Sequence, residues 1–377
     1  IEKPDTRVHL QASYDITSRE LSFTTTSTAP VVKIITDYLK EDAPETLSRI
    51  RATNGSTPQI QLNGTAAFSE DFALNSITLL GKLEQRGLVF GKQEADHLQL
   101  SFFMKDGDFN LDQCMINFPE GHLRCAAQVA NGTGKAELEI SLSDEVILEL
   151  VRCFSGDEKL ALPQELSFSS NLEAHLSCEM STAPFIAGKS RIEDLIPALK
   201  SSQLQFRTGD IIFDGAKLLS PTLNLEVSGI SYQDDIKVQH AHLQLRAANA
   251  LENQLETRDV HLDLELNDIL SDSGLETLKL GHTVLNVNAG AVELDNISLN
   301  RLQCTSSADK LELSFDHPIE TLESSALAIH ATLESLHRGD ISAEGIALDV
   351  NIPPLITSQP FESMPSPSPP LAGLTAE

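Results

Sequence analysis

The chain has 377 residues, and its 55 acidic and 27 basic side chains give a formal net charge of −28 at pH 7. A surface this acidic repels phosphate backbones and anionic lipid headgroups, which argues against nucleic-acid binding and electrostatic membrane docking. The absence of Trp argues against sugar binding, and no apolar stretch approaches the roughly 20 residues of a transmembrane helix.

The chain begins at Ile1 without a basic n-region or an apolar signal segment. We therefore expect a processed protein or a fragment of a longer one. Residues 1–28 are expected to form N-terminal strands that continue the sheet of the following unit.

Residues 29–154 form a first predicted unit, in which a helix precedes a β-meander. The sequence VVKIITDYLK at 31–40 has helical spacing. The runs DHLQLSFFM at 96–104 and KAELEISL at 135–142 alternate apolar and polar residues with period two, which predicts strands with one apolar face. DEVILELVRCF at 144–154 has acids in its first turn, where the helix dipole favours them, and is predicted to close the unit as an amphipathic helix.

Two cysteines, Cys114 and Cys125, flank the turn sequence FPEGH at 118–122. A two-residue loop of Pro119 and Glu120 would place the cysteines directly opposite each other, which is compatible with a cross-strand disulfide. A three-residue turn with a bulge would shift the register by one and leave two separate thiols. The positions of the proline and the glycine favour the bulged turn.

Residues 155–352 form a second predicted β-rich unit. SRIEDLIPALK at 190–200 begins with a capping box and predicts a helix, whereas PTLNLEVSG at 221–229, VHLDLELND at 260–268 and TVLNVNAG at 283–290 again predict strands. Residues 353–377 are rich in Pro and Ser and are expected to be a disordered tail. The predicted fold is mainly β, a long antiparallel β-meander curved into an elongated groove or solenoid-like sheet, with a few short amphipathic helices.

One phrase recurs four times, as GDFNLDQCMI, GDIIFDGAKL, GAVELDNISL and GDISAEGIAL, starting at residues 107, 209, 290 and 339. Each copy carries an acid at a similar place: Asp112, Asp214, Asp295 and Glu344. A catalytic acid is normally needed once, so the repetition favours an architectural role in a turn, a polar edge or a barrier to edge pairing.

The sequence contains no recognisable catalytic or phosphate-binding motif. His240 and His242 are two positions apart on a predicted strand, so they share a face as two metal ligands would, but no third ligand can be identified from the sequence. We therefore predict no catalytic residue, no metal, no cofactor and no enzymatic activity.

The succession from Ala29 to Phe154 has a distinctive rhythm: a helix, TPQIQLNGTAAF at 57–68, a series of alternating strands, and GKAELEISLSDEVILELV at 134–151. This rhythm resembles the AsmA-like proteins of the Gram-negative envelope, including their C-terminal region, and a looser version spans about Leu176 to Asp316. The resemblance implies a long sheet curved into an apolar groove, as in bridge-like lipid-transfer proteins. It also implies a periplasmic location and a role in phospholipid traffic or outer-membrane assembly. Membrane contact is expected only through a missing anchor or the chain ends.

A one-sided apolar sheet of this length can close on itself, pack against helices or hold acyl chains. We expect a phospholipid or other acyl-chain ligand, other envelope proteins as further partners, and no nucleic acid. The alternation predicts these lipid-facing side chains: Leu98, Leu100, Phe102, Leu138, Ile140, Leu223, Leu225, Leu262, Leu264, Leu285 and Val287. The alternative is a structural or interaction module, such as a β-solenoid or adhesin-like stalk with an interior filled by its own side chains.

Overall fold

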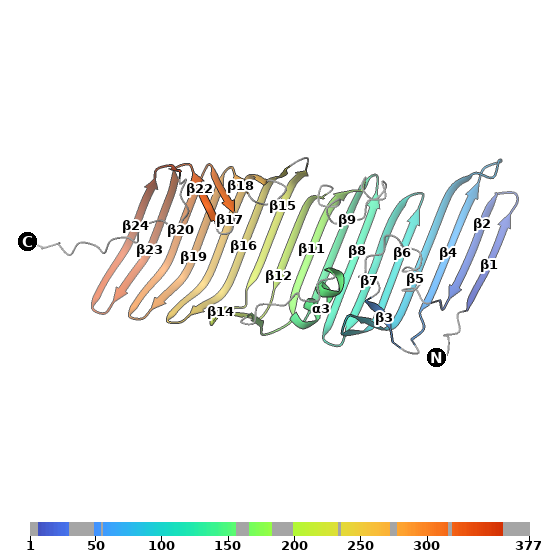
Figure 1. The fold of residues 1–377 in the computed structure, drawn as a ribbon, viewed down its shortest axis with the longest axis horizontal. Helices are drawn as coiled ribbons and strands as arrows, with labels where there is room; N and C mark the ends of the chain where they lie inside the picture. Colours follow the sequence, from blue (N-terminus) through green and yellow to red (C-terminus); the bar gives the residue numbers. More distant parts are fainter. Residues whose placement is uncertain are drawn as a thin grey trace, which may run out of the picture.

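The computed structural model describes residues 7–29, 49–53, 56–155, 166–182, 199–232, 235–271, 277–315 and 319–356. These residues form one large antiparallel sheet that remains open and does not close into a barrel (Figure 1). The predicted mainly β fold with a long curved meander is therefore confirmed.

Most strands pair with their neighbours in chain order, because short turns join consecutive alternating segments. The main row of strands, each antiparallel to the next, is β1 (Val8–Asp15), β2 (Glu20–Ser27), β4 (Gln59–Phe68), β5 (Leu74–Phe90), β6 (Gln93–Lys105), β7 (Asp108–Phe118), β8 (Gly121–Ala130), β9 (Thr133–Leu142), β11 (Leu172–Ser181), β12 (Leu199–Arg207), β15 (Thr222–Tyr232), β16 (Ile236–Glu252), β17 (Leu255–Ser271), β19 (Thr283–Leu294), β20 (Ile297–Ala308), β23 (Leu327–Arg338) and β24 (Ile341–Ile352).

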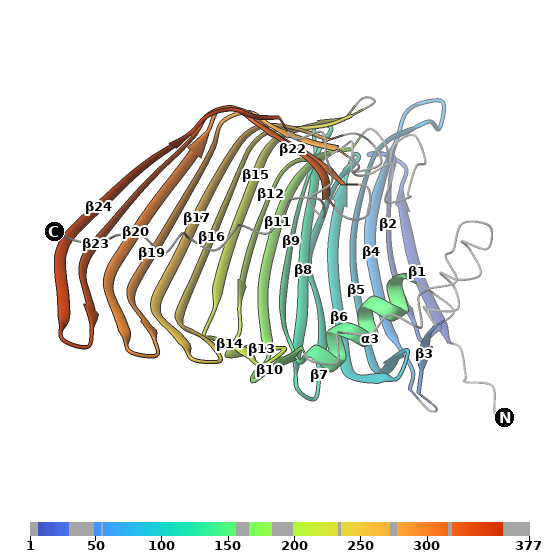
Figure 2. The same ribbon diagram turned by 60° about the vertical axis from the view of Figure 1, so that its left-hand side comes forward.

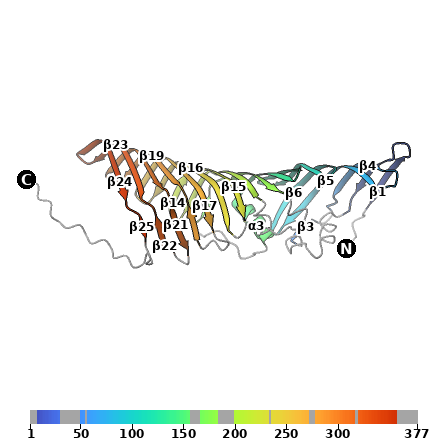
Figure 3. The same ribbon diagram turned by 90° about the horizontal axis from the view of Figure 1, so that it is seen from above.

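Short strands extend the two margins of this row. At one margin β18 (Thr277–Leu280) pairs with the end of β17, and β21 (Leu311–Phe315), β22 (Ile319–Ser324) and β25 (Leu355–Ile356) follow in turn. At the other, β14 (Ala216–Leu219) pairs with the end of β16, followed by β13 (Asp210–Phe213) and β10 (Ser167–Phe168). β3 (Ile50–Ala52) pairs with the end of β5. In Figure 3, β14, β21, β22 and β25 lie on the same side of the sheet as the helix α3.

The helix predicted at 144–154 is confirmed as α3 (Asp144–Ser155). Ser143 caps it: its carbonyl accepts a hydrogen bond from the N–H of Ile147 at 3.0 Å, and its Oγ accepts one from the N–H of Val146 at 3.5 Å. The apolar side of α3 packs across one end of strands β5 to β9 (Figure 2). The buried core at this contact consists of Leu88, Phe90, Ala95, Phe118, Leu142, Val146, Leu150 and Cys153.

The sheet continues across the predicted boundary at residue 155, because β9 pairs with β11 from Leu142↔Leu172 to Thr133↔Ser181. The helices predicted at 31–40 and 190–200 lie outside the described residues, except for Leu199 and Lys200, which begin β12 instead. The part of the predicted tail from residue 357 onward also lies outside the described residues.

A line of backbone distortions crosses the C-terminal half of the sheet. Asp259 in β17, Arg301 in β20 and Gly345 in β24 have φ values of 51, 49 and 64°, and the strand registers place them on one line. A left-handed residue interrupts the extended backbone, and regular pairing skips one position beside each of the three. These residues therefore mark a line along which the regular pairing of the sheet is interrupted.

The four copies of the recurring phrase occupy different structural positions. Asp214 and Asp295, with φ of 48 and 49°, lie at the turns of the hairpins β13–β14 and β19–β20. Asp112 and Glu344 lie inside strands β7 and β24. The repeated acids therefore do not stack into one site, and two of them serve as turn residues, where Asp tolerates the left-handed conformation.

Candidate ligand-binding face

One face of the sheet carries continuous rows of apolar side chains, formed by residues that are direct register partners on successive strands. The first apolar row contains Leu100, Cys114, Cys125, Leu138, Leu176, Leu204, Leu225, Leu243, Leu264 and Leu285. The second apolar row, two residues along each strand, contains Leu98, Ile116, Leu123, Ile140, Ala174, Phe206, Leu223, Leu245, Leu262 and Val287.

The two rows are long compared with a lipid. Each crosses the ten strands from β6 to β19, and neighbouring strands lie 4.7–4.9 Å apart, so a row spans about 43 Å. This exceeds the roughly 30 Å hydrocarbon core of a bilayer. At β20 the rows lose their large side chains, because Ser306 faces Leu285 and Cys304 faces Val287. We refer to the surface formed by the two rows as the apolar face.

The strand registers bring all the predicted lipid-facing residues onto this one face. Ten of them belong to the two rows, and the eleventh, Phe102, lies beside them opposite Leu111 of β7. All eleven are half-buried, and none belongs to the buried core. Whether they contact lipid remains a prediction.

Cover over the apolar face is uneven. α3 is the only helix among the described residues, and its core packs against Leu98, Ile116, Leu123 and Ile140 of the second row. Beyond β9, no helix in the described ranges lies over the rows. The apolar side chains from β11 to β19 are therefore partly open to solvent.

Several members of the rows were not among the predicted residues: Ile116, Leu123, Leu176, Leu204, Phe206, Leu243 and Leu245. The signal was present for most of them, because Leu204 and Phe206, or Leu243 and Leu245, are spaced two apart in the same way as the predicted residues. What the sequence lacked was the register that joins them to the other strands.

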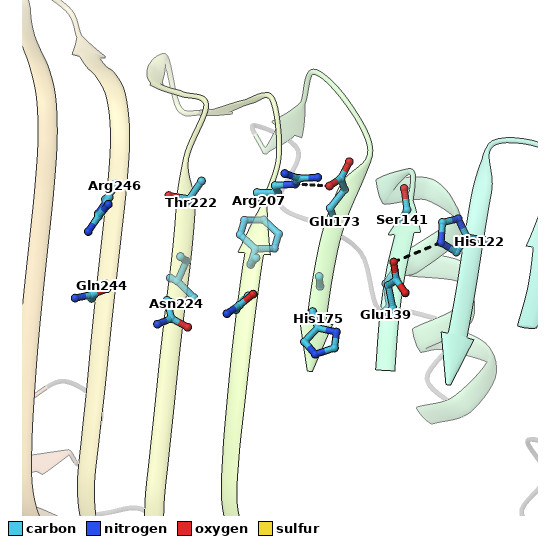
Figure 4. Close-up of a pocket in the computed structure, with 15 residues that line it drawn as sticks. His122, Glu139, Ser141, Glu173, His175, Arg207, Thr222, Asn224, Gln244 and Arg246 are labelled. Carbon is cyan, nitrogen blue, oxygen red and sulfur yellow. Dashed lines mark hydrogen bonds and ion pairs between the residues drawn. The ribbon is translucent and has the colours of Figure 1, made fainter. Parts of the chain in front are cut away.

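The opposite face, which we call the wet face, is polar and contains an open hollow of about 700 Å³ across β8 to β16 (Figure 4). Its labelled side chains are His122, Glu139, Ser141, Glu173, His175, Arg207, Thr222, Asn224, Gln244 and Arg246. Acids and bases here pair with one another: Arg207 Nε contacts Glu173 Oε2, and His122 Nε2 lies 4.0 Å from Glu139 Oε1. None of the four recurring acids lines this hollow.

Cys114 and Cys125 occupy adjacent positions in the first apolar row. Phe118 pairs with Gly121, so the turn is the two-residue loop of Pro119 and Glu120, and the bulged turn favoured by the sequence is wrong. Both cysteines are free thiols in this structure. Burial, with a further contribution from Cys125, raises the pKa of Cys114 from 9.0 to about 11.

Comparisons of the sequence with family models and curated proteins, and of the fold with solved structures, found no match. The resemblance to AsmA-like proteins therefore stays a prediction. Within the described ranges, no helix is both long enough and apolar enough to cross a membrane.

Proposed function

We propose that this chain is a non-enzymatic, AsmA-like protein of the Gram-negative cell envelope that binds acyl chains along its apolar face. In this role it conducts phospholipid through the periplasm or supports outer-membrane assembly. The observation that carries the proposal is the apolar face itself, with two uninterrupted rows across ten strands that are only half-buried.

The physical argument is the length of the half-buried apolar surface. Large contiguous apolar patches are rare on soluble monomers and usually mark a binding site. Each methylene group removed from water contributes about 0.8 kcal/mol, so laying ten methylenes of an acyl chain along the rows contributes about 8 kcal/mol before the cost of ordering the chain. This binding requires no fixed polar group, which agrees with the absence of a catalytic motif.

The shape of the surface favours movement along the sheet over tight capture. Between Leu100 and Leu285 the first row contains only leucine and cysteine. No charged or amide side chain therefore interrupts the path of an acyl chain across these strands. The enclosing short strands lie at the margins and leave the middle of the rows accessible. A ligand can therefore enter from the side, as a conduit for lipids requires.

Native mass spectrometry of the gently purified chain, with extraction of bound lipid, tests the proposal. We expect adducts of phospholipid mass that are lost in the double variant L264D/L285D. An acyl chain bound over these positions would remove two carboxylates from water, which is unfavourable. V284D is the matched control: Val284 adjoins Leu285 but is paired with Glu265 on the wet face, so this variant should retain lipid.

Circular dichroism must show that the double variant keeps its strand content. A wild-type chain that carries no lipid, even after incubation with phospholipid vesicles, would contradict the proposal and favour the structural or interaction module. Equal lipid binding by wild type and L264D/L285D would show that the ligand lies elsewhere.

A further inference from the structure

The wet face holds a group of metal-ligating side chains at the hairpin of β16 and β17. His242 lies directly opposite Glu265, and its Nε2 is 3.2 Å from Oδ2 of Asp263. One ligand atom from each of these three residues lies within 4.8 Å of the others. Ligand atoms around one tetrahedral metal ion lie about 3.3–3.6 Å apart, because each is about 2.0–2.2 Å from the ion, so small side-chain rotations would bring these three atoms around one ion.

A neighbouring side chain holds this group in place. Gln244 Nε2 donates a hydrogen bond of 2.8 Å to Oδ2 of Asp263, which fixes the carboxylate. Such outer partners orient metal ligands in known sites.

The charge around the group also suits a cation. Glu226 of β15 lies opposite His242 on the other side, so the imidazole has an acidic residue on each neighbouring strand. Among the described residues, no lysine or arginine forms an ion pair with Glu226, Asp263 or Glu265. The only basic side chain that pairs with one of these carboxylates in the described residues is His242, which contacts Asp263.

A second observation comes from His261, two residues before Asp263 in β17. Its Nε2 is shielded from solvent and has no hydrogen-bond partner, although a buried polar atom is normally satisfied. His242, Asp263 and Glu265 thus combine one imidazole nitrogen with two carboxylates, and the unpartnered Nε2 of His261 lies on the same strand as these carboxylates.

We propose that His242, Asp263 and Glu265 form a binding site for a divalent transition-metal ion of the zinc type, completed by water. One nitrogen and two carboxylate oxygens are a ligand set that zinc accepts. The ion would join β16 to β17 and stabilise the middle of the sheet. This inference is independent of lipid binding, because the site lies on the wet face. From the sequence, only the His240-x-His242 pair was visible, and the strand register supplies the other ligands.

Isothermal titration of the untagged, chelator-treated chain with Zn²⁺ tests the site, with the visible absorption of Co²⁺ as a second probe. We expect saturable one-to-one binding, weakened at least about tenfold in H242A and in E265Q. H330A is the matched control, since His330 Nδ1 contacts Asp349 Oδ1 on another hairpin without belonging to a three-ligand group in the described residues. It should bind Zn²⁺ like the wild type.

Thermal unfolding provides an independent readout, because a ligand that binds only the folded state raises Tm. Zn²⁺ should raise Tm of the wild type and of H330A by more than that of E265Q, whose exposed side chain can be changed without disturbing the core. No saturable Zn²⁺ binding by the wild type, or binding that H242A and E265Q leave unchanged, would overturn the proposal.

Discussion

Cys114 of β7 lies directly opposite Cys125 of β8, in the middle of the apolar face. Directly opposite residues in an antiparallel pair have Cα atoms about 4.5 or 5.5 Å apart, and both distances fall within the range that a disulfide spans. The thiols also interact, since each affects the pKa of the other. The backbone of this hairpin therefore already places Cys114 and Cys125 within the distance that a disulfide spans.

We predict that glutathione disulfide, which is reduced to two molecules of glutathione, oxidises this pair to a Cys114–Cys125 disulfide. Closing a loop of this length should stabilise the fold by about 2–3 kcal/mol in the chain-entropy model. Peptide mapping identifies the bond, and thermal unfolding measures its effect. A C125S variant, which cannot form the bond, should gain no stability on oxidation; a mixed disulfide to glutathione at Cys114 in the wild type would contradict the prediction.

The raised pKa of Cys114 makes stability depend on alkaline pH. The thiol titrates at 9.0 when unfolded and at about 11 when folded, so the folded state binds the proton more tightly. Its contribution to the free energy of unfolding is therefore complete below pH 9 and is lost as the pH rises towards 11. Denaturant unfolding of the reduced chain between pH 8 and 11 should show a smaller decline in C114A than in the wild type. Identical declines would contradict the raised pKa.

The packing of α3 on the sheet predicts a contrast between two neighbouring residues. Leu150 is 6% exposed within the core, whereas Val151 is 43% exposed on the outer side of the same helix. L150A should lower the free energy of unfolding by about 2–5 kcal/mol, because it leaves a cavity against the strands. V151A should change it by no more than about 0.5 kcal/mol. Similar losses in both variants would mean that the helix is not held by this face.

Some features of the apolar face were predictable from the sequence. The period-two alternation assigned Leu262, Leu264, Leu285 and Val287 to one side of their strands, and the registers agree. Alternation is reliable here because the pleat of a strand sends successive side chains to opposite faces whatever the strand pairs with. The helix after Ser143 was predictable for a similar reason, since its cap and its spacing are local.

Local sequence misled where the same pattern suits two structures. The recurring phrase forms a hairpin around Asp214, whereas around Asp112 it forms a single strand whose register shifts at that residue. The turn at Pro119 was likewise compatible with a two-residue loop, which places Cys114 opposite Cys125, or with a bulged three-residue turn, which does not. The sequence favoured the bulged turn, but the structure has the two-residue loop. In each case the neighbouring strands select the conformation, because a shift of one residue would turn an apolar row towards water.

The sequence by itself determined that the protein is a long one-sided β-meander and which side chains share a face, because both follow from alternation within each strand. Only the tertiary structure decided how the strands join: that β9 pairs with β11 across α3, that Cys114 meets Cys125, and that Glu265 lies beside His242. These relationships depend on contacts between different segments of the chain, and the sequence pattern within one segment does not specify its partner. The tertiary structure also left the apolar face open, because in the described residues one helix covers only one end of it.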